Sequence, residues 1–217
     1  MKSIGKRILA PAALAALLGA SAFAHAEQQK DAPVSHAAFE AKFRYCRTCH
    51  GVQGQGFRGV YPMPRLAGQQ HEYIANQLNA FIEKDRVHPV MGHVAGALSP
   101  DMVRQLSEAF HSLNPPPLGG APAGLSAEGK SIFDNGVDSA GVPPCASCHG
   151  PEAKGDGQFP RLAGQLNDYI IAKLKNWEKE RGQKAKNDDP SAIMQPIAHN
   201  LTPQQIAAVA AYVSNLK

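Results

Sequence analysis

The sequence predicts an all-α protein made of two similar helical domains in tandem, and three observations support this prediction. Apolar residues recur at spacings of three and four towards the end of each half of the chain, which is the spacing of an amphipathic helix. No run of alternating β-branched residues indicates a strand. A set of short motifs occurs twice, so the 217 residues divide into two units of the same kind.

The repeated motifs keep the same order in both halves. C-x-x-C-H-G comes first, followed by P-R-L-A-G-Q, Tyr-Ile, and a methionine seven residues ahead of L-[ST]-P. In the first half they lie at residues 46–51, 64–69, 73–74, 91 and 98–100, and in the second half at 145–150, 160–165, 169–170, 194 and 201–203. Five landmarks in one order indicate the tandem duplication of a domain of about 90 to 100 residues.

Helix signals place the elements within each unit. Ser99-Pro100 and Thr202-Pro203 are typical helix starts, because a hydroxyl side chain caps the first turn and proline suits the first helical position. The last helix follows, with apolar stripes at Val103, Leu106, Phe110 and Leu113, and at Ile206, Val209, Ala210, Val213 and Leu216. We expect a middle helix after each P-R-L-A-G-Q motif and a short early helix at about residues 37–45 and 126–134.

Prolines mark the boundary between the two units. Asn114 is followed by three consecutive prolines, Leu118 and two glycines, a composition that stops a helix and favours extended backbone. We therefore expect a first domain at residues 27–113, a linker at 114–125 and a second domain at 126–217.

The first 26 residues have the composition of a secretory signal peptide. Three basic residues precede an apolar, alanine-rich run at 8–24, and Ala24-His25-Ala26 matches an A-x-A cleavage site. An uncleaved membrane anchor is the alternative, but Pro11 and the predominance of alanine over larger apolar residues disfavour a spanning helix. We expect cleavage after Ala26 and export to the periplasm.

Removal of this segment changes the charge of the protein. The whole chain has a formal net charge of +4 at pH 7, and its first 26 residues carry three basic and no acidic side chains, so the mature chain has a charge of +1. This balance gives no support for nucleic-acid binding. Any docking preference must come from local patches of charge.

All four cysteines belong to the C-x-x-C-H motifs, which are the sequence signature of covalent haem attachment. On one helical turn, Cys46 and Cys49 can each form a thioether to a vinyl group of the same porphyrin, while His50 points its imidazole at the iron. The second motif repeats this arrangement with Cys145, Cys148 and His149. A few short helices per domain form a thin core, which an apolar haem would complete. The sequence therefore predicts two covalently bound haem c groups with iron.

Other cysteine chemistries fit these motifs less well. Structural zinc needs four ligands in one site, but the two pairs lie about a hundred residues apart, against roughly 15 to 20 in a zinc ribbon. A thioredoxin-like redox pair requires a strand-to-helix context that is missing here. Disulfides are common in exported proteins, but they explain neither the histidine after each pair nor the rest of the repeat.

With these motifs the chain resembles class I c-type cytochromes, and as a tandem pair it is similar to the dihaem cytochrome c4 family over essentially the whole mature chain. The resemblance implies that each domain wraps one haem and that the two domains face each other. The carbonyl oxygens that hold the Nδ1–H groups of the two motif histidines would then belong to Pro64 and Pro160. The haem faces would pack against Leu66 and Leu162.

The resemblance also implies partners. Such proteins carry electrons in bacterial respiratory chains, with a terminal oxidase as acceptor and a quinol-oxidising complex or another cytochrome as donor. No nucleic-acid partner is expected, and a peripheral association with the membrane stays open.

We predict methionine as the second axial ligand of each iron. Met91 and Met194 occupy equivalent places in the repeat, and His/Met ligation raises the reduction potential relative to more electron-donating ligand pairs. Met63 and Met102 are expected to be packing residues. The competing histidines have no histidine at their equivalent positions; they are His71, His88, His93 and His199.

Two functional classes fit these sites. An electron carrier, which is not an enzyme, has both axial positions of each iron filled. A dihaem enzyme such as a peroxidase requires one iron that opens for substrate, with acid or base groups close to it. The duplicated methionines favour the carrier, either free or as a bound subunit of a larger complex.

Further residues of the repeat have two interpretations each. Tyr73 and Tyr169 either hydrogen-bond a haem propionate or a partner haem edge, or pack their helices. Arg65 and Arg161 either pair with propionates or are solvated surface residues, which we favour. The charged stretch at residues 173–189 is expected to be a solvated helix end and loop, with a docking surface as the alternative.

Overall fold

The computed structural model describes residues 33–181 and 191–217. The predicted signal peptide lies outside the described residues, as does the later part of the charged stretch at 173–189. The described residues form helices and loops, and their β-structure is confined to three isolated bridges, which confirms the all-α prediction. No helix among them combines the length and the apolarity needed to span a bilayer.

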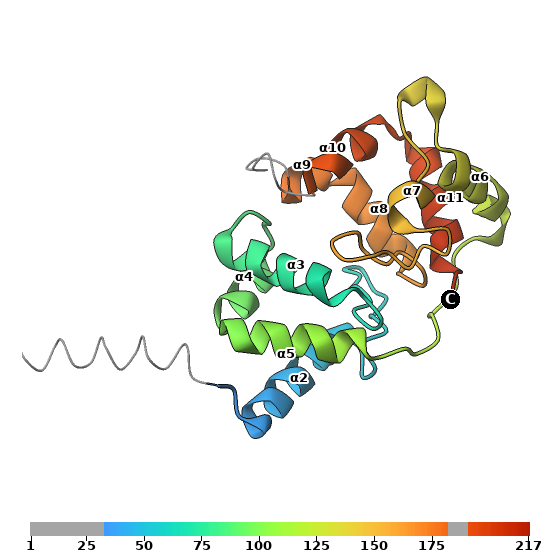
Figure 1. Cartoon of the computed structure of the whole chain (residues 1–217). Coiled ribbons are helices and arrows are strands. Elements are labelled where there is room, and N and C mark those ends of the chain that lie inside the picture. Colours follow the sequence, from blue (N-terminus) through green and yellow to red (C-terminus); the bar gives the residue numbers. More distant parts are fainter. Residues whose placement is uncertain (1–32, 182–190) are drawn as a thin grey trace, which may run out of the picture.

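Residues 33–113, the first half, contain four α-helices: α2 (His36–His50), α3 (His71–Glu83), α4 (Pro89–Gly96) and α5 (Pro100–His111). Proline lies in the first turn of α4 and of α5. Ser99 caps α5, because its hydroxyl accepts the backbone N–H of Met102 at 3.2 Å. Helix α3 packs against both α4 and α5, as Figure 1 shows in green.

Residues 123–217, the second half, repeat this plan with more helices. They are α6 (Ser126–Asn135), α7 (Ala146–His149), α8 (Asn167–Lys175), α9 (Trp177–Glu180), α10 (Ser191–Asn200) and α11 (Pro203–Ser214), with short 3-10 helices at Ala123–Leu125 and Asp138–Ala140. A capping box begins α11, in which Gln205 N donates to the Thr202 hydroxyl at 3.3 Å and Thr202 N donates to the Gln205 side chain at 2.9 Å. Both predicted helix starts are thus confirmed.

The helix before the cysteines differs between the halves. Helix α2 is longer than predicted, because it continues without a break through the cysteine motif to His50. In the second half, α6 ends at Asn135 and ten residues separate it from α7. Gly136 has a φ of 74°, and a Cβ there would lie 2.3 Å from the carbonyl oxygen of Val142. Only glycine fits this turn, so the chain must leave the helix at this point.

The cores of the two halves are also built differently. In the second half α6 lies so close to α11 that a Cβ on Gly129 would be 2.0 Å from the carbonyl oxygen of Ala208. Phe133 follows on the same helix and is fully buried. In the first half, α2 meets α5 through Phe43 and Phe110, whose ring centroids are 4.9 Å apart in an edge-to-face arrangement.

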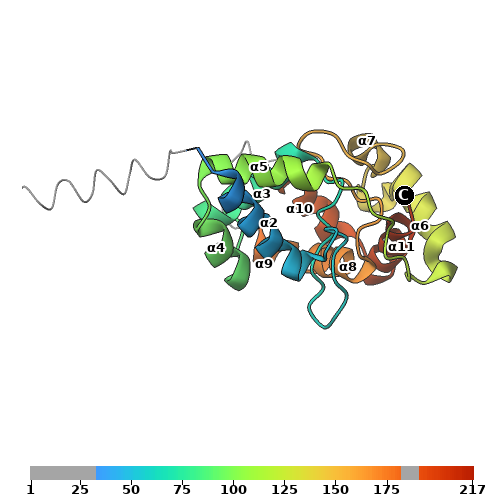
Figure 2. The same ribbon diagram turned by 90° about the horizontal axis from the view of Figure 1, so that it is seen from below.

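The two halves lie side by side, and the linker joins them along one edge (Figures 1 and 2). Their contacts are reciprocal. Arg86 of the first half donates to the Tyr169 hydroxyl at 3.1 Å, and Arg181 of the second half donates to the Tyr73 hydroxyl at 3.1 Å. Each half therefore supplies one arginine and one tyrosine to the interface, so these tyrosines do more than pack their helices.

The linker is attached to the first half by Arg65. This side chain is 3% exposed, and it donates to the carbonyls of Pro115 at 2.8 Å and Pro116 at 3.4 Å. Burial, together with the nearby Arg161, lowers the pKa of Arg65 to about 10, so the side chain stays charged at neutral pH. The expectation of a solvated arginine is wrong at this position, because the guanidinium joins the motif to the linker.

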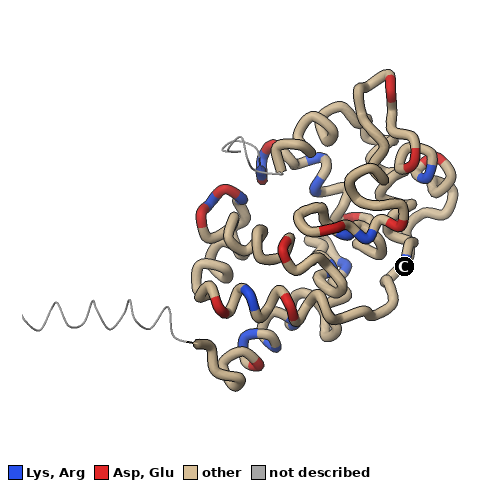
Figure 3. Tube along the Cα trace, viewed as in Figure 1, with Lys and Arg blue, Asp and Glu red and all other residues tan. Residues whose placement is uncertain are grey.

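The described part of the charged stretch at 173–189 also differs from the prediction. Lys173 pairs with Glu180, and Arg181 is buried. The Glu180 carbonyl accepts the backbone N–H of Val87 from the first half at 3.0 Å, which places this segment at the interface between the halves. Elsewhere, residues of both charge signs are interspersed along the chain (Figure 3).

Candidate haem-binding sites

Each C-x-x-C-H motif occupies one helical turn. In the first half this is the last turn of α2. In the second half Cys145 precedes α7 with helical backbone angles, and its carbonyl accepts the N–H of His149 at 3.0 Å. All four cysteines are free thiols, and the second thiol of each motif, Cys49 or Cys148, is exposed. Two thiols and an imidazole therefore project from one turn in each half.

The first thiol of each motif is not activated by its surroundings. Burial raises the pKa of Cys46, and it raises the pKa of Cys145 to about 11. A redox-active cysteine has a lowered pKa instead, because its thiolate is the reacting species. The structure thus disfavours a thioredoxin-like pair and agrees with thiols that serve as attachment points.

Both motif histidines are held by a proline carbonyl. His50 Nδ1 lies 2.9 Å from the Pro64 oxygen, and His149 Nδ1 lies 2.9 Å from the Pro160 oxygen. A carbonyl can only accept, so Nδ1 carries the proton and Nε2 carries the free lone pair. Burial lowers the pKa of both histidines. Each half therefore presents a neutral, oriented imidazole, which is the form that binds iron.

A loop of the same design positions each proline. Two successive N–H groups of the P-R-L-A-G-Q motif donate to the Gly54 carbonyl at 2.9 Å in the first half, and to the Ala153 carbonyl at 2.8 and 2.9 Å in the second. Gly54 and Ala153 both have positive φ, at 68° and 55°. Alanine adopts this conformation rarely, so the hydrogen bonds of the loop hold Ala153 in place against a local preference.

The two candidate methionine ligands lie on short helices that the sequence analysis did not predict. Met91 is in the first turn of α4, and Met194 is in α10. Both side chains are partly buried. The N-terminal turn of α4 is capped by His88, whose Nδ1 accepts the Met91 backbone N–H at 3.2 Å. His88 therefore has a structural role next to Met91.

The other competing histidines face solvent. His71, His93 and His199 are all exposed. His71 and His199 also lie 3.2 Å from the carboxylates of Glu72 and Glu178, respectively. These positions fit surface residues better than ligands of a buried iron.

Two buried donors indicate that a further group belongs in the fold. Arg86 Nε and Trp177 Nε1 are buried and have no hydrogen-bond partner among the described residues. A buried donor without a partner is costly, and the propionate carboxylates of a haem would supply acceptors. Leu66 and Leu162, the predicted haem-packing residues, are only partly buried. Together with the free thiols and the oriented imidazoles, these features fit haem.

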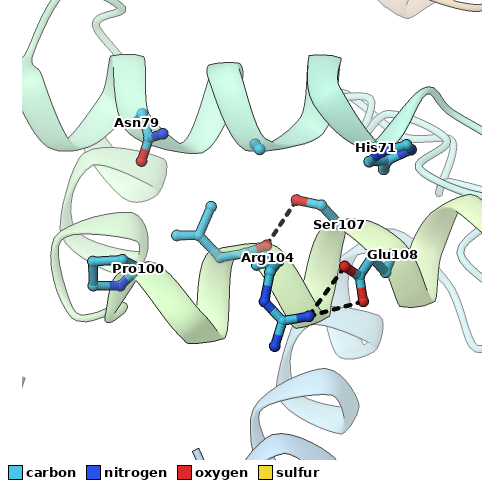
Figure 4. Close-up of a pocket in the computed structure, with 8 residues that line it drawn as sticks. His71, Asn79, Pro100, Arg104, Ser107 and Glu108 are labelled. Carbon is cyan, nitrogen blue, oxygen red and sulfur yellow. Dashed lines mark hydrogen bonds and ion pairs between the residues drawn. The ribbon is translucent and has the colours of Figure 1, made fainter. Parts of the chain in front are cut away.

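A pocket of about 190 Å³ lies between α3 and α5. Three of its polar side chains are paired, since Arg104 contacts Glu108 at 3.1 Å and Ser107 donates to the Val103 carbonyl at 2.7 Å (Figure 4). It is smaller than the roughly 300 to 1,000 Å³ of a typical ligand site. None of the predicted haem residues lines it.

Comparisons with known proteins agree with these sites. A family model for cytochrome c matches residues 126–217. Cytochrome c4 of Thiocapsa roseopersicina is 38% identical over 175 residues, covering 79% of this chain and 86% of the relative. The solved cytochrome c4 of Acidithiobacillus ferrooxidans is 37% identical, with a TM-score of 0.67, covering 79% of this chain and 98% of that one. The chain belongs to the dihaem cytochrome c4 family.

A further relative is named for its role in electron transfer. A protein of Thiomonas intermedia, named as a thiosulfate dehydrogenase electron acceptor, is 35% identical over 215 residues, which cover 96% of this chain and 90% of the relative. Membership of the cytochrome c4 family implies covalently bound haem c with iron and a part in electron transfer. Two haems per chain follow from the same membership.

Two further residues, the glutamines that end the two P-R-L-A-G-Q motifs, were not predicted to have a role. Gln69 and Gln165 are 6% and 7% exposed, and each reaches into the other half of the molecule. Gln69 bonds the backbone of Arg161, and Gln165 bonds the backbone of Arg65. Their presence in both copies of the motif was the available signal.

Proposed function

We propose that this cytochrome c4 is a periplasmic electron carrier with one complete haem site in each of two domains, at residues 27–113 and 126–217, joined by the linker at 114–125. In each domain two cysteines attach the haem, one histidine and one methionine ligate its iron, and one leucine packs on its face. These residues are Cys46, Cys49, His50, Met91 and Leu66 in the first domain, and Cys145, Cys148, His149, Met194 and Leu162 in the second.

The duplicated hydrogen bond from histidine Nδ1 to a proline carbonyl is the observation that carries this proposal. It appears at 2.9 Å in both halves, although the helices before the two motifs differ. A bound haem supplies an iron that alternates between the ferrous and ferric states. The chain keeps each imidazole ring from rotating, holds its proton on Nδ1, and leaves Nε2 on the side of the ring that faces away from the proline carbonyl. A ligand held in this way moves little when the charge of the site changes, so little reorganisation opposes electron transfer.

The carrier is distinguished from a dihaem peroxidase by its response to an external ligand. If His50 with Met91 and His149 with Met194 fill both axial positions, the reduced protein should show no change in its visible spectrum when carbon monoxide is added at neutral pH. Hydrogen peroxide turnover should be negligible. Rapid binding of carbon monoxide at one haem, together with saturable consumption of peroxide, would instead favour the enzyme.

The ligand assignment is tested by substitution at the methionines. Met91→His and Met194→His should each retain the haem and lower the reduction potential of that domain, because imidazole donates more strongly to iron than a thioether does. Met63→Leu is the matched control, since Met63 lies in the loop ahead of Pro64 and outside the proposed ligand set. If neither histidine variant moves either potential, the methionine assignment is wrong.

The relatives support a candidate for the electron donor. The resemblance to a thiosulfate dehydrogenase electron acceptor favours a thiosulfate-oxidising enzyme as donor. A quinol-oxidising complex or another cytochrome is the alternative, and a terminal oxidase is the proposed acceptor. The test is stopped-flow reduction of the oxidised protein by each purified donor. A second-order rate that only one donor sustains identifies the partner.

Export is tested on the protein purified from its native host. Cleavage after Ala26 predicts a mature chain that begins at Glu27 and is released with the periplasmic fraction. The intact mass should equal that chain plus two haems. A chain that still begins at Met1 and stays in the membrane fraction would contradict the signal-peptide assignment.

A further inference from the structure

The peptide group that holds the first histidine also bonds to the other half of the molecule. His50 Nδ1 donates to the Pro64 carbonyl, and the N–H at the other end of the same peptide group belongs to Arg65. This N–H donates at 2.8 Å to Oε1 of Gln165, which lies 100 residues later in the chain. A single peptide group thus connects the histidine of one half to a side chain of the other.

The second half contains the mirror arrangement. His149 Nδ1 donates to the Pro160 carbonyl at 2.9 Å. The N–H of the same peptide group is that of Arg161, and it donates to Oε1 of Gln69 at 2.7 Å. In each half, the peptide group that accepts the histidine hydrogen bond is therefore itself bonded to a glutamine of the other half.

Both glutamine side chains are fixed in orientation. Gln165 Nε2 donates to the Arg65 carbonyl at 3.0 Å, and Gln69 Nε2 donates to the Arg161 carbonyl at 2.9 Å. Each Oε1 also accepts the N–H of the next residue in its own chain segment, at 3.0 Å for Gln165 and 2.9 Å for Gln69. Because both amides are buried and each is held by three hydrogen bonds, neither turns away easily from the peptide group that it contacts.

Such a chain of hydrogen bonds changes the electronic character of the histidine. An acceptor on the N–H side of a conjugated peptide group increases the negative charge on its carbonyl oxygen, and hydrogen bonds in series strengthen one another. A more negative carbonyl draws the Nδ1 proton more strongly, which makes Nε2 a better electron donor to a metal. Removal of the glutamine oxygen should have the opposite effect.

We propose that Gln165 and Gln69 are positioning residues that act across the interface, each strengthening electron donation by the histidine of the opposite half and so lowering the reduction potential of that half. This inference rests on the proposed function, in which His50 and His149 ligate iron. It makes the properties of each haem depend on a side chain that belongs to the other repeat.

A purely structural role would predict something different. The neighbouring Gln70 also crosses the interface, since its Nε2 donates to the carbonyls of Lys154 at 2.9 Å and Gly155 at 3.2 Å. The hydrogen bonds of the Gln70 side chain go to Lys154 and Gly155 and not to either of the two proline–arginine peptide groups. Its removal therefore weakens the contact between the halves without breaking either chain of hydrogen bonds. Gln70→Met is the matched control.

The test uses the full-length protein with both haems attached. Gln165→Met and Gln69→Met are titrated potentiometrically at pH 7 while the haem methyl resonances of each half are followed by NMR, which gives the two potentials separately. Gln165→Met should raise the potential of the haem bound at Cys46 and Cys49 more than that of the other haem. Gln69→Met should show the reverse pattern, and Gln70→Met should shift neither haem selectively.

A second pair of variants distinguishes an electronic effect of the glutamines from a general disruption of the interface. Gln165→Glu and Gln69→Glu keep an oxygen acceptor and add negative charge, so the potential of the opposite half should fall instead of rise. The inference is overturned if the methionine variants shift only the haem of their own half, shift both haems equally, or shift neither. It is also overturned if the glutamate and methionine variants shift the potential in the same direction.

The same samples separate this inference from the proposed function. Haem content by mass and the response to carbon monoxide are measured for every variant. A parent protein that lacks two covalent haems, or that binds carbon monoxide, speaks against the carrier itself. Intact haem sites without the crossed pattern of shifts speak only against the role of the glutamines.

Discussion

The two halves of this cytochrome c4 reach the same histidine geometry from different helices. In the first half, α2 runs unbroken through the cysteine motif and meets α5 through an aromatic pair. In the second, ten residues separate α6 from α7, and α6 packs against α11 at backbone contact. Yet both histidines lie 2.9 Å from their proline carbonyls. The histidine geometry therefore follows from the motif turn and the following loop, and we expect the preceding helix to affect mainly the stability of each half.

The largest difference between the halves is expected from Gly129. In the Gly129→Val variant, the new Cβ would lie 2.0 Å from the Ala208 carbonyl oxygen and 2.8 Å from the Cβ of Tyr212. Backbone cannot move aside easily, so α6 and α11 must separate, and the free energy of unfolding should fall by at least about 3 kcal/mol. Denaturant unfolding followed by circular dichroism measures this loss.

The control for this prediction is Gly124→Ala. A Cβ at Gly124 meets nothing within 4 Å, so stability should change by less than about 0.5 kcal/mol. Equal stability of Gly129→Val and the parent protein would show that the contact between α6 and α11 is unimportant, and the comparison between the halves would fail.

A smaller effect is expected from the aromatic pair of the first half. Phe43→Ala removes a ring that contacts both Phe39 and Phe110. Because Phe43 is only partly buried, the loss should be about 2 kcal/mol, below that of a fully buried phenylalanine. Thermal unfolding of the variant measures it. Tyr45→Ala, on the same helix but with an exposed ring, should have little effect, and a similar loss from both variants would refute the special role of Phe43.

Reciprocal contacts should give equal effects in the two halves. Tyr73→Phe and Tyr169→Phe each remove one hydroxyl that accepts from an arginine of the other half at 3.1 Å. Each should cost about 1 kcal/mol, and the two losses should agree within about 0.5 kcal/mol. Tyr61→Phe, on an exposed loop residue, is the control. A large inequality would mean that one side dominates the interface.

The smallest expected effect is a loss of stability at low pH in the first half that the second half lacks. Asp101 accepts the backbone N–H of Val34 at 2.8 Å, whereas the equivalent position in the second half is the neutral Gln204. The hydrogen bond from Val34, followed by that from Arg104, holds the pKa of Asp101 below its usual value of 3.8. Its contribution to stability is therefore complete above pH 3.8 and is lost as the pH falls through the lowered pKa.

Hydrogen exchange at the start of α2 measures this effect. Protection of the Val34 amide should decrease below about pH 4 in the parent protein. In Asp101→Asn, the amide should be less protected than in the parent at neutral pH and should lack this acid-dependent loss. An Asn variant that keeps the same acid transition would show that another group is responsible.

Local signals in the sequence predicted the longer helices and the cysteine motifs, but not the short helices α4 and α10. The hydroxyl-proline pairs before α5 and α11 predicted the helix starts because capping depends on neighbouring residues alone. The two C-x-x-C-H motifs predicted haem attachment, which the family membership supports. Pro64 and Pro160 came from the resemblance to the family, and the structure places their carbonyls at the histidines.

Contacts between the halves left no such local signal. Arg65 was expected at the surface because an arginine beside prolines gives no indication of burial, yet it bonds the linker carbonyls. Lys173 and Arg181 were expected in solvent because they lie in a stretch that is dense in charge. The glutamines of the repeated motif went unassigned, because their partners lie about a hundred residues away in the chain. A duplicated motif shows which residues the two copies share, but it does not show that the copies contact each other.

The attachment of the linker has a consequence for the kinetics of the protein. Arg65 holds the carbonyls of Pro115 and Pro116, and Pro117 lies against Gly164 of the second half, within reach of any Cβ added there. A segment that contacts both halves is not a free tether, so the two halves need no diffusional search to meet. We expect electron exchange between them to be independent of solvent viscosity, whereas exchange with an outside partner slows as glycerol is added.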